Sequence, residues 1–168
     1  MTITLIGMPG AGKSMMGIEL AKALAYQWID ADKAIEEKAG RPLQNIINED
    51  GIAAFQKLEE EILRSLAKEN TVISTGGSAI YYDSAMKNFK ECGKVVYLYV
   101  GVEEIIRRLG DYSKRGIVLA PGKTIRDLYE ERTPLYEKYA DITVNCNGTD
   151  YITYQKRLNE TIISLLKP

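Results

Sequence analysis

Five short apolar runs alternate along the chain with longer stretches in which apolar residues recur every three or four positions. The short runs have the length and composition of β-strands and comprise residues 2–6, 26–30, 71–74, 95–100 and 142–144. The longer stretches have helical spacing, which is clearest at Phe55, Leu58, Ile62 and Leu66, at Ile105 with Leu109, and at Leu158 with Ile162 and Leu165. Strands and helices that alternate in this way are typical of a parallel sheet with helices on both faces. The pattern therefore predicts a three-layer α/β/α fold whose apolar helical stripes form the core.

The size and composition fit one globular domain. The chain has 168 residues, of which 45% are hydrophobic and 27% are charged, and a chain of this length buries roughly 70% of its unfolded surface. No repeat, linker or low-complexity tract interrupts it, so we expect a single domain over residues 1–168. The 22 Lys and Arg residues nearly balance the 23 Asp and Glu residues, giving a formal net charge of -1. We therefore expect small-molecule ligands, with no nucleic acid and no membrane as a partner.

The residue types that are missing or rare narrow the chemistry further. The sequence contains no histidine, so a proton transfer would use a carboxylate, a lysine, a tyrosine or water. Cys92 and Cys146 lack the spacing of metal ligands and are expected to be ordinary thiols of a reducing compartment. The first strand begins at once, and no run approaches about 18 consecutive apolar residues. We expect a cytoplasmic protein.

A complete phosphate-binding loop follows the first predicted strand. Residues 7–14 read Gly-Met-Pro-Gly-Ala-Gly-Lys-Ser and match G-x-x-x-x-G-K-[S/T], and a helical pattern follows over residues 15–25. Glycines let the backbone N–H groups point inward at the start of a helix, where they form a nest for anions. In such a loop the lysine, here Lys13, reaches the outer phosphates, and the hydroxyl of Ser14 binds Mg²⁺. The sequence therefore predicts a nucleoside triphosphate site.

Two aspartates end the second predicted strand. Ligands of open parallel sheets bind beyond the carboxyl ends of the strands, and extended residues two apart point to the same side. We therefore expect Asp30 and Asp32 to face one cleft. One carboxylate would support Mg²⁺ through water while the other takes the proton of an acceptor hydroxyl. An N-cap role for one of the two remains open as an alternative or an addition.

The third predicted strand is followed by Gly76, Gly77 and Ser78. Two glycines allow a ligand to approach the backbone closely and leave N–H groups free to donate. Any strand-to-helix turn can use such glycines, so this signal depends on its position at the carboxyl end of a strand.

Residues 110–124 join two predicted helices without a clear period. Loops of this length in compact domains are usually functional, so we expect a lid over about residues 110–123. Arg108 and Arg115 flank its start and are candidates for phosphate or adenine contacts, with solvated surface charge as the alternative.

Arg132 lies on the apolar stripe of the helix after this segment, four residues beyond Leu128. A charge among apolar positions requires a partner or a polar cleft. Pro134 is a candidate bend or restart of the same helix, so the face on which Arg132 lies is approximate.

In order and spacing, these residues resemble the shikimate kinase family over nearly the whole chain. The matching positions are residues 7–14, the Ile-Asp-Ala-Asp stretch 29–32 with Ile35 and Glu36, Phe55 with Glu59, Gly76 and Gly77, Arg115, and the Arg-Thr-Pro-Leu-Tyr segment 132–136. The resemblance implies a nucleoside-monophosphate-kinase-like fold with a five-stranded parallel sheet in the order 2-3-1-4-5. It also implies a monomer that uses ATP and Mg²⁺ to phosphorylate a small hydroxylated carboxylate, shikimate, in aromatic amino acid biosynthesis.

The resemblance implies roles for individual residues. Asp32 contacts the acceptor hydroxyl and is its base, Arg132 binds the acceptor's carboxylate, and Arg115 touches both the acceptor and the transferred phosphate. The acceptor segment covers about residues 31–60. The implied catalytic residues are Lys13, Asp32 and Arg115, and the implied metal ligands are Ser14 and Asp30. The implied nucleotide contacts are Gly10, Ala11, Gly12, Lys13, Ser14, Met15, Arg108 and Asn147, and the implied acceptor contacts are Asp32, Gln56, Gly76, Gly77, Ser78, Arg115 and Arg132.

The sequence departs from the family pattern at three places. Gln56 stands where members carry arginine, Ser78 stands where they carry a third glycine, and residues 116–118 read Gly-Ile-Val in place of Pro-Leu-Leu. A guanidinium binds a carboxylate bidentately with full charge, whereas the amide of Gln56 offers neutral donors. Losing one charge-assisted pair in a desolvated site costs roughly 2 to 5 kcal/mol of binding free energy.

Two explanations of these departures are open. Either Lys57 or another nearby cation replaces the arginine and shikimate remains the acceptor, or the pocket fits a different polyol or hydroxy acid. Nucleotide and gluconate kinases share the loop and sheet, but the paired aspartates and the 132–136 segment favour the shikimate-kinase pattern. A GTPase lacks support because no Asn-Lys-x-Asp motif is present. A non-catalytic ATP-binding protein is the alternative from another class, against which the intact Lys13, Ser14, Asp30 and Asp32 argue.

Overall fold

The sheet has five parallel strands in the order β2-β3-β1-β4-β5. The structure is a computed structural model that describes residues 1–111, 117 and 119–167. The strands are β1 (Thr2–Ile6), β2 (Gln27–Asp30), β3 (Thr71–Ser74), β4 (Gly93–Tyr99) and β5 (Ile142–Asn145). Each predicted strand is present, and the strand order that the family resemblance implied is confirmed.

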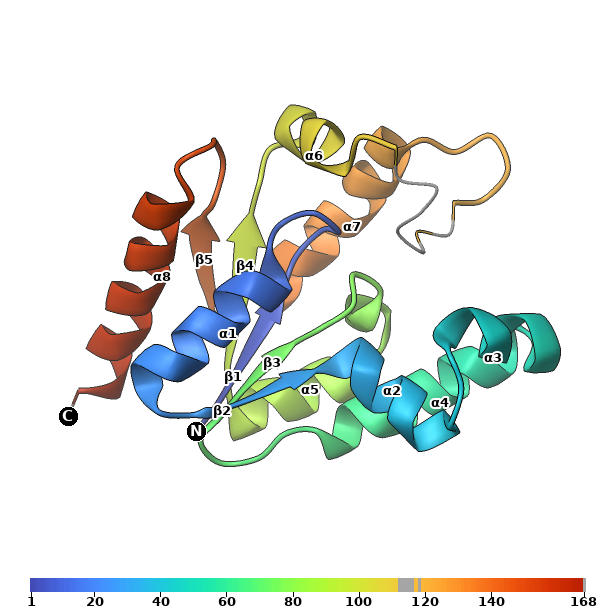
Figure 1. Cartoon of the computed structure of the whole chain (residues 1–168), viewed down its shortest axis with the longest axis horizontal. Helices are drawn as coiled ribbons and strands as arrows, with labels where there is room; N and C mark the ends of the chain where they lie inside the picture. The colour runs from blue at the N-terminus through green and yellow to red at the C-terminus, as the bar shows by residue number, and fades with distance from the viewer. Residues whose placement is uncertain (112–116, 118, 168) are drawn as a thin grey trace.

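Helices cover both faces of this sheet and complete three layers (Figure 1). The helices are α1 (Lys13–Leu24), α2 (Ala31–Ala39), α3 (Leu43–Asp50), α4 (Ile52–Ser65), the short 3₁₀ helix η1 (Ala79–Tyr81), α5 (Asp83–Cys92), α6 (Val102–Leu109), α7 (Ile125–Tyr139) and α8 (Tyr151–Leu166). Helices α1 and α8 pack together on one face, and α5 and α7 contact β4 on the other. Helices α2, α3 and α4 contact one another beyond the β2 edge of the sheet. No helix in the described part of the chain is both long and apolar enough to cross a bilayer.

Burial follows from the place of each strand in the sheet. All five residues of the central strand β1 are buried, because helices cover it from both faces. The edge strand β2 is only partly buried. Four boundaries differ from the predicted ones by one or two residues, among them the ends of β4 at Tyr99 and of β5 at Asn145. Strand β2 starts one residue later because the Tyr26 N–H bonds to the carbonyl of Ala21 and closes α1, and β4 starts at Gly93 because that residue pairs with Thr2.

The sequence makes Pro134 a candidate for a bend or a restart of helix α7, and the restart does not occur, because α7 runs through Pro134 as one helix. Its beginning is fixed by a capping box in which Thr124 and Asp127 bond to each other's backbone N–H groups. Leu128 and Tyr136 are buried on either side of the proline, and this tertiary packing holds the helix together despite the missing N–H.

A hydrogen-bond relay fixes the helix after the phosphate loop against the sheet. Trp28 Nε1 on β2 donates to Ser74 Oγ at 3.0 Å, and Ser74 Oγ donates to the carbonyl of Lys13 at 2.8 Å. Gly17 on α1 lies over this relay, and a Cβ added there would meet Ser74 Oγ at 2.3 Å and Trp28 Nε1 at 2.9 Å. The start of α1 therefore depends on the absence of a side chain at position 17.

We predict that Gly17→Ala destabilises the protein, although alanine is normally the better helix residue. Helix propensity favours alanine by about 0.5–1 kcal/mol, whereas forcing a methyl group into a packed site costs about 1–3 kcal/mol. The net loss in the free energy of unfolding should be about 1–2 kcal/mol in urea denaturation. The same substitution in a Ser74→Ala background should cost less, since the closest clashing atom is then gone. An equal loss in both backgrounds would contradict the proposed clash.

Candidate active site

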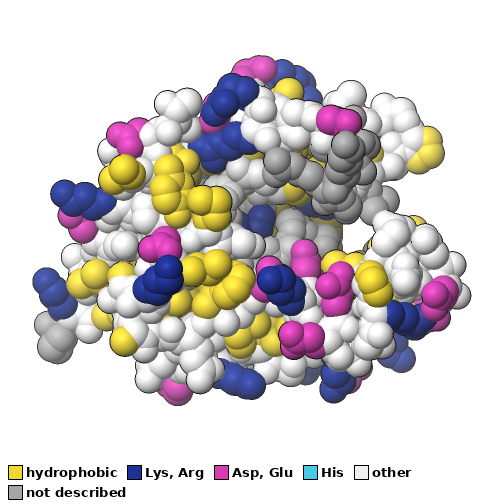
Figure 2. All heavy atoms as spheres, in the orientation of Figure 1, with side chains coloured by type: hydrophobic (Ala, Val, Ile, Leu, Met, Phe, Trp, Pro, Cys, Tyr) yellow, Lys and Arg dark blue, Asp and Glu magenta, His cyan; other side chains and the backbone are white. Residues whose placement is uncertain are grey.

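The loops after β1, β2 and β3 meet at the carboxyl edge of the sheet. Parallel neighbours bring the phosphate loop, the start of α2 and the Gly76–Ser78 turn to the same edge, as expected for an open α/β sheet. The molecular surface is hollowed on this face, between α1 and the region of α2 to α4, and both acidic and basic side chains border the hollow (Figure 2).

The phosphate loop has the backbone that its motif requires. Gly10 and Gly12 adopt φ angles of 84° and 90°, which glycine reaches without steric cost. Helix α1 begins directly after Gly12, with no capping side chain and no acidic residue in its first turn. No carboxylate of its own first turn neutralises its N-terminal N–H groups and the positive end of its dipole, which fits a phosphate group.

Lys13 is buried inside this loop. Its Nζ donates to the carbonyl oxygens of Gly7 at 2.7 Å and Met8 at 3.0 Å. Burial lowers the pKa of Lys13 to about 8, and the negative charge of Asp32 opposes that shift. The ammonium group thus lies between the loop and the acidic start of α2.

The aspartates reach the site in a different way from the one the sequence predicted. Strand β2 ends at Asp30 and α2 begins at Ala31, so Asp32 lies in a helical turn and strand alternation does not explain its direction. Asp30 is the N-cap of α2 and accepts from the Lys33 N–H at 3.2 Å, which confirms the capping interpretation. The negative charges of Asp30 and Asp32 nevertheless interact. Asp32 is accessible to solvent, yet the protein around it displaces enough water to raise its pKa, which the charge of Asp30 raises further.

The oxygen ligands on this edge fit a Mg²⁺ ion that is held largely by a nucleotide. Ser14 is exposed in the first turn of α1, and Asp30 is the last residue of strand β2. Across the residues that the structure describes, no group of three or more acidic, cysteine or histidine side chains could hold a metal by itself. Magnesium usually retains waters and phosphate ligands and needs only one or two protein oxygens.

Three consecutive residues after β3 contact three charged side chains from three helices. A Cβ on Gly76 would lie 2.8 Å from Asp32 Oδ1, and a Cβ on Gly77 would lie 2.6 Å from Arg132 Nη1. The next residue, Ser78, donates its hydroxyl proton to Glu59 Oε1 at 2.9 Å. The absence of side chains at the two glycines therefore allows Asp32 of α2 and Arg132 of α7 to pack against one short turn.

Glu59 is the member of this cluster to which the sequence analysis assigned no role. It is only 3% exposed, and its Oε2 accepts from the Tyr82 hydroxyl at 2.6 Å. Burial raises the pKa of Glu59, while the hydroxyls of Tyr82 and Ser78 lower it. A signal was present, because Glu59 lies four residues after Phe55 and three before Ile62, on an otherwise apolar helical face.

Arg132 is held at the other side of the turn by aromatic residues. Its guanidinium lies over the Tyr81 ring at 5.5 Å, and its Nε donates to the Tyr81 hydroxyl at 3.4 Å. One turn further along α7, the buried Tyr136 donates to the carbonyl of Gly77 at 2.9 Å and contacts Met8 Sδ at 4.0 Å. Helix α7 thus fixes Arg132, the glycine turn and the phosphate loop relative to one another.

The two positions discussed for the missing arginine lie on α4. Gln56 and Lys57 are both exposed, and the ion pairs among the described residues do not include Lys57. The replacement of the arginine by Lys57 therefore stays a prediction.

Arg108 joins three segments around the expected adenine position. Its Nε donates to Glu104 at 2.8 Å, Nη1 donates to the carbonyl of Gly10 at 3.3 Å, and Nη2 donates to the carbonyls of Cys146 and Gly148, each at 2.8 Å. Its guanidinium donors are thus used by the phosphate loop, α6 and the loop after β5. Arg108 therefore has a framing role, in which it holds these three segments together.

Two other expected nucleotide contacts lie at the surface of the same region. Asn147 accepts from the Gly101 N–H at 2.9 Å, and Met15 is 61% exposed in the first turn of α1. Ala11 is buried within the phosphate loop.

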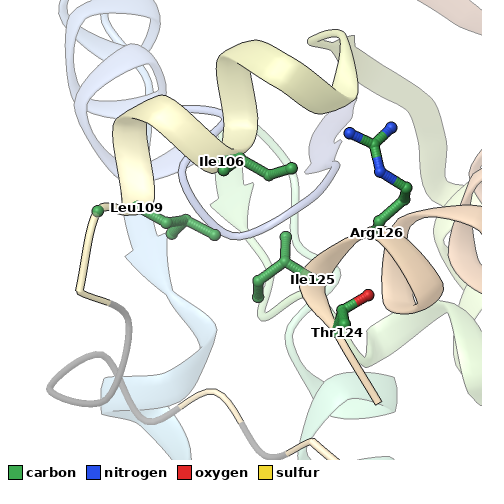
Figure 3. A pocket seen from close by; sticks show the side chains of 6 residues that line it. Ile106, Leu109, Thr124, Ile125 and Arg126 are labelled. Atoms are coloured by element: carbon green, nitrogen blue, oxygen red, sulfur yellow. The ribbon is translucent and has the colours of Figure 1, made fainter.

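The expected lid over residues 110–123 is described only in part, and Arg115 and residues 116 and 118 of the third departure lie outside the described residues. A cavity of about 400 Å³ lies at its base and is lined by Ile106, Leu109, Gly110, Thr124, Ile125 and Arg126. Ile106 and Leu109 of α6 point toward Ile125 of α7 (Figure 3). The described lining of this cavity includes none of the expected acceptor contacts.

Comparison with known proteins agrees with this geometry. The family model for shikimate kinase matches residues 9–164. A shikimate kinase from Mycobacterium avium is 39% identical over 146 residues, which cover 85% of this chain and 82% of that protein. One from Francisella tularensis subsp. novicida is 38% identical over 150 residues, covering 87% and 85%.

Solved structures give the same result. The structure of shikimate kinase from Acinetobacter baumannii in complex with shikimate has a TM-score of 0.86 at 32% identity and covers 99% of this chain and 95% of that one. Shikimate kinase from Aquifex aeolicus has a TM-score of 0.83 at 33% identity, covering 99% of both chains. With its phosphate loop, its sheet order and its glycine turn between Asp32 and Arg132, the chain belongs to the shikimate kinase family.

Proposed function

We propose that this protein transfers the terminal phosphoryl group of ATP to a hydroxyl of shikimate, forming shikimate 3-phosphate and ADP. The observation that carries the proposal is the approach of Asp32 and Arg132 to the Gly76–Gly77 turn, beside the buried Lys13. A carboxylate that takes a proton and a guanidinium that binds an anion are the two groups that a hydroxylated carboxylate requires. The shikimate complex of the Acinetobacter baumannii relative supports this choice of acceptor.

The phosphate loop and α1 bind the nucleotide in this proposal. The backbone N–H groups of Gly10, Ala11, Gly12 and the start of α1 surround the phosphates, and Lys13 neutralises the outer ones. Ser14 and, through water, Asp30 would hold a Mg²⁺ ion, which screens the phosphate charge and orients the terminal group. The bond between the terminal phosphorus and the bridging oxygen breaks, and ADP leaves with that electron pair.

Asp32 acts on the acceptor in this proposal. As the new oxygen–phosphorus bond forms, Asp32 takes the proton of the attacking hydroxyl. Its raised pKa makes it a better proton acceptor than an ordinary aspartate while Lys13 keeps its charged form accessible. Arg132 binds the acceptor's carboxylate and so orients the hydroxyl toward Asp32. The role of Arg115 in contacting the acceptor and the transferred phosphate stays a prediction, as do a cytoplasmic location and a monomeric state.

The acceptor is tested by an ADP-release assay with ATP, Mg²⁺ and millimolar shikimate. We expect turnover with shikimate and much less with quinate, gluconate, homoserine or nucleoside monophosphates. Lys13→Ala serves as the control for nucleotide-dependent signal and should lose activity with every acceptor. Turnover of one of the other alcohols without turnover of shikimate would overturn shikimate as the acceptor while leaving a small-molecule kinase.

We predict that Asp32→Asn lowers kcat by about 10²- to 10⁴-fold, since an amide cannot take the proton. Nucleotide affinity should stay close to that of the wild type, and fluorescence of Trp28, the one tryptophan of the sequence, provides a titration signal near α1.

The wild-type kcat should fall on acidification, because protonation removes the base, and it should fall at a higher pH than for an ordinary aspartate. The variant should lack this acidic limb; unchanged turnover would rule out Asp32 as the base.

Arg108 and its neighbour Arg107 provide a matched pair of substitutions. Arg107 is exposed and contacts Glu104, whereas Arg108 also bridges to the phosphate loop and the loop after β5. Lysine at position 108 cannot reach these acceptors together, so Arg108→Lys should raise the KM for ATP about tenfold, with little effect on the KM for shikimate. Arg107→Lys should change neither constant by more than about twofold. Equal effects of the two variants would contradict a framing role for Arg108.

A further inference from the structure

The buried carboxylate of Glu59 takes no direct part in the proposed reaction. Both of its oxygens are occupied, Oε1 by the Ser78 hydroxyl at 2.9 Å and Oε2 by the Tyr82 hydroxyl at 2.6 Å. The ion pairs formed within residues 1–111, 117 and 119–167 do not include Glu59. A buried carboxylate is thus held in this part of the structure by two neutral donors, although a cation would bind it more strongly.

A suitable cation lies nearby on α7. Arg132 packs against Gly77, the residue before Ser78, and its charge is among the causes that lower the pKa of Glu59, yet the ion pairs among the described residues do not include Arg132. The guanidinium lies instead against Gly77 and Tyr81, one residue before Ser78 in the turn and three after it. A carboxylate and a guanidinium that approach freely form two parallel hydrogen bonds. The two groups are therefore neighbours that the fold keeps unpaired.

Electrostatics would move Glu59 toward Arg132 if its hydroxyl partners were removed. Asp32, on the other side of the turn, repels the carboxylate, as the direction of its effect on the pKa of Glu59 shows. Arg132 attracts it, and a buried carboxylate that loses a donor must find another or become protonated. An internal pair between Glu59 and Arg132 would then occupy the group that the acceptor's carboxylate requires.

We propose that Ser78, together with Tyr82, is a positioning residue that holds Glu59 away from Arg132 and so keeps the Arg132 guanidinium available for an anionic acceptor. This inference rests on the proposed function, because it takes the ligand of Arg132 to be the carboxylate of shikimate. Ser78 thereby determines affinity for the acceptor, and it acts through Glu59 without touching the transferred phosphoryl group.

The first test is Ser78→Ala, which removes the hydroxyl and leaves a side chain of nearly the same size. The KM for shikimate should rise about tenfold, the equivalent of one charge-assisted interaction, because Glu59 then competes for Arg132. The values of kcat and of the KM for ATP should change by less than about twofold, since the base and the phosphate loop are untouched. Ser78→Thr retains the hydroxyl and should restore most of the affinity.

A double-substitution cycle separates this role from a purely structural one. Glu59→Gln removes the charge that would compete for Arg132, so in that background Ser78→Ala should change the KM for shikimate by less than about twofold. Tyr82→Phe removes the second donor and should reproduce the effect of Ser78→Ala if the alanine variant proves too unstable to assay. Melting temperatures measured for every variant report on folding separately.

The chain provides a control pair that joins α4 to α5. Ser84 donates to Glu60 at 2.6 Å, one residue along α4 from Glu59, but both side chains lie outside the glycine turn. Ser84→Ala should leave the KM for shikimate unchanged.

The possible outcomes distinguish the two claims. If the wild type phosphorylates shikimate and Ser78→Ala either leaves its KM unchanged or raises it equally in the Glu59→Gln background, the positioning role is wrong and the proposed function stands. A wild-type protein that neither binds nor phosphorylates shikimate overturns the proposed function first, and with it this inference.

Discussion

The proposed acceptor site depends on two adjacent glycines whose missing side chains leave room for a carboxylate and a guanidinium. At Gly76 and Gly77 a single added carbon would lie within 2.8 Å of Asp32 Oδ1 and 2.6 Å of Arg132 Nη1. Asp32 lies on α2 and Arg132 lies on α7, two helices that are far apart in sequence. The backbone of the glycine turn is where their side chains come together. The buried Tyr136 donates to the carbonyl of Gly77. The position of the turn is therefore set by the protein core and not by the ligand.

The sheet order explains how a fully buried strand can position polar groups at the site. Strand β3 lies between β1 and β2, so its carboxyl end lies between the phosphate loop and the start of α2. Ser74, the last residue of β3, accepts from Trp28 on β2 and donates to the carbonyl of Lys13, the first residue of α1. The donor half and the acceptor half of the site are therefore parts of one hydrogen-bonded edge. A substitution that shifts α1 would therefore change the geometry of both halves of the site.

Sequence patterns identified what is encoded locally and missed what arises from packing across the fold. The phosphate loop was predictable because its glycines and Lys13 act within eight consecutive residues, and the strands were predictable from their apolar runs. Strand order followed only from the family resemblance, because local periodicity carries no information about neighbours in a sheet. The strand argument for Asp32 was wrong because α2 begins one residue before it. Glu59 was noted as a matching position but given no role, because its partner Ser78 lies 19 residues away and on another element.

The two departures in the acceptor pocket make sense when they are considered together. An arginine at position 56 would lie three residues before Glu59 on α4, at the spacing where oppositely charged side chains of a helix pair. With Gln56 in that position, Glu59 has no such cation, and a buried carboxylate left without donors would be costly. The hydroxyl of Ser78, at the position where the family carries glycine, supplies one donor, and Tyr82 supplies the other. The loss of a positive charge on α4 and the gain of a hydroxyl in the turn therefore compensate each other at Glu59, and Arg132 stays unpaired with Glu59 and available to the proposed acceptor.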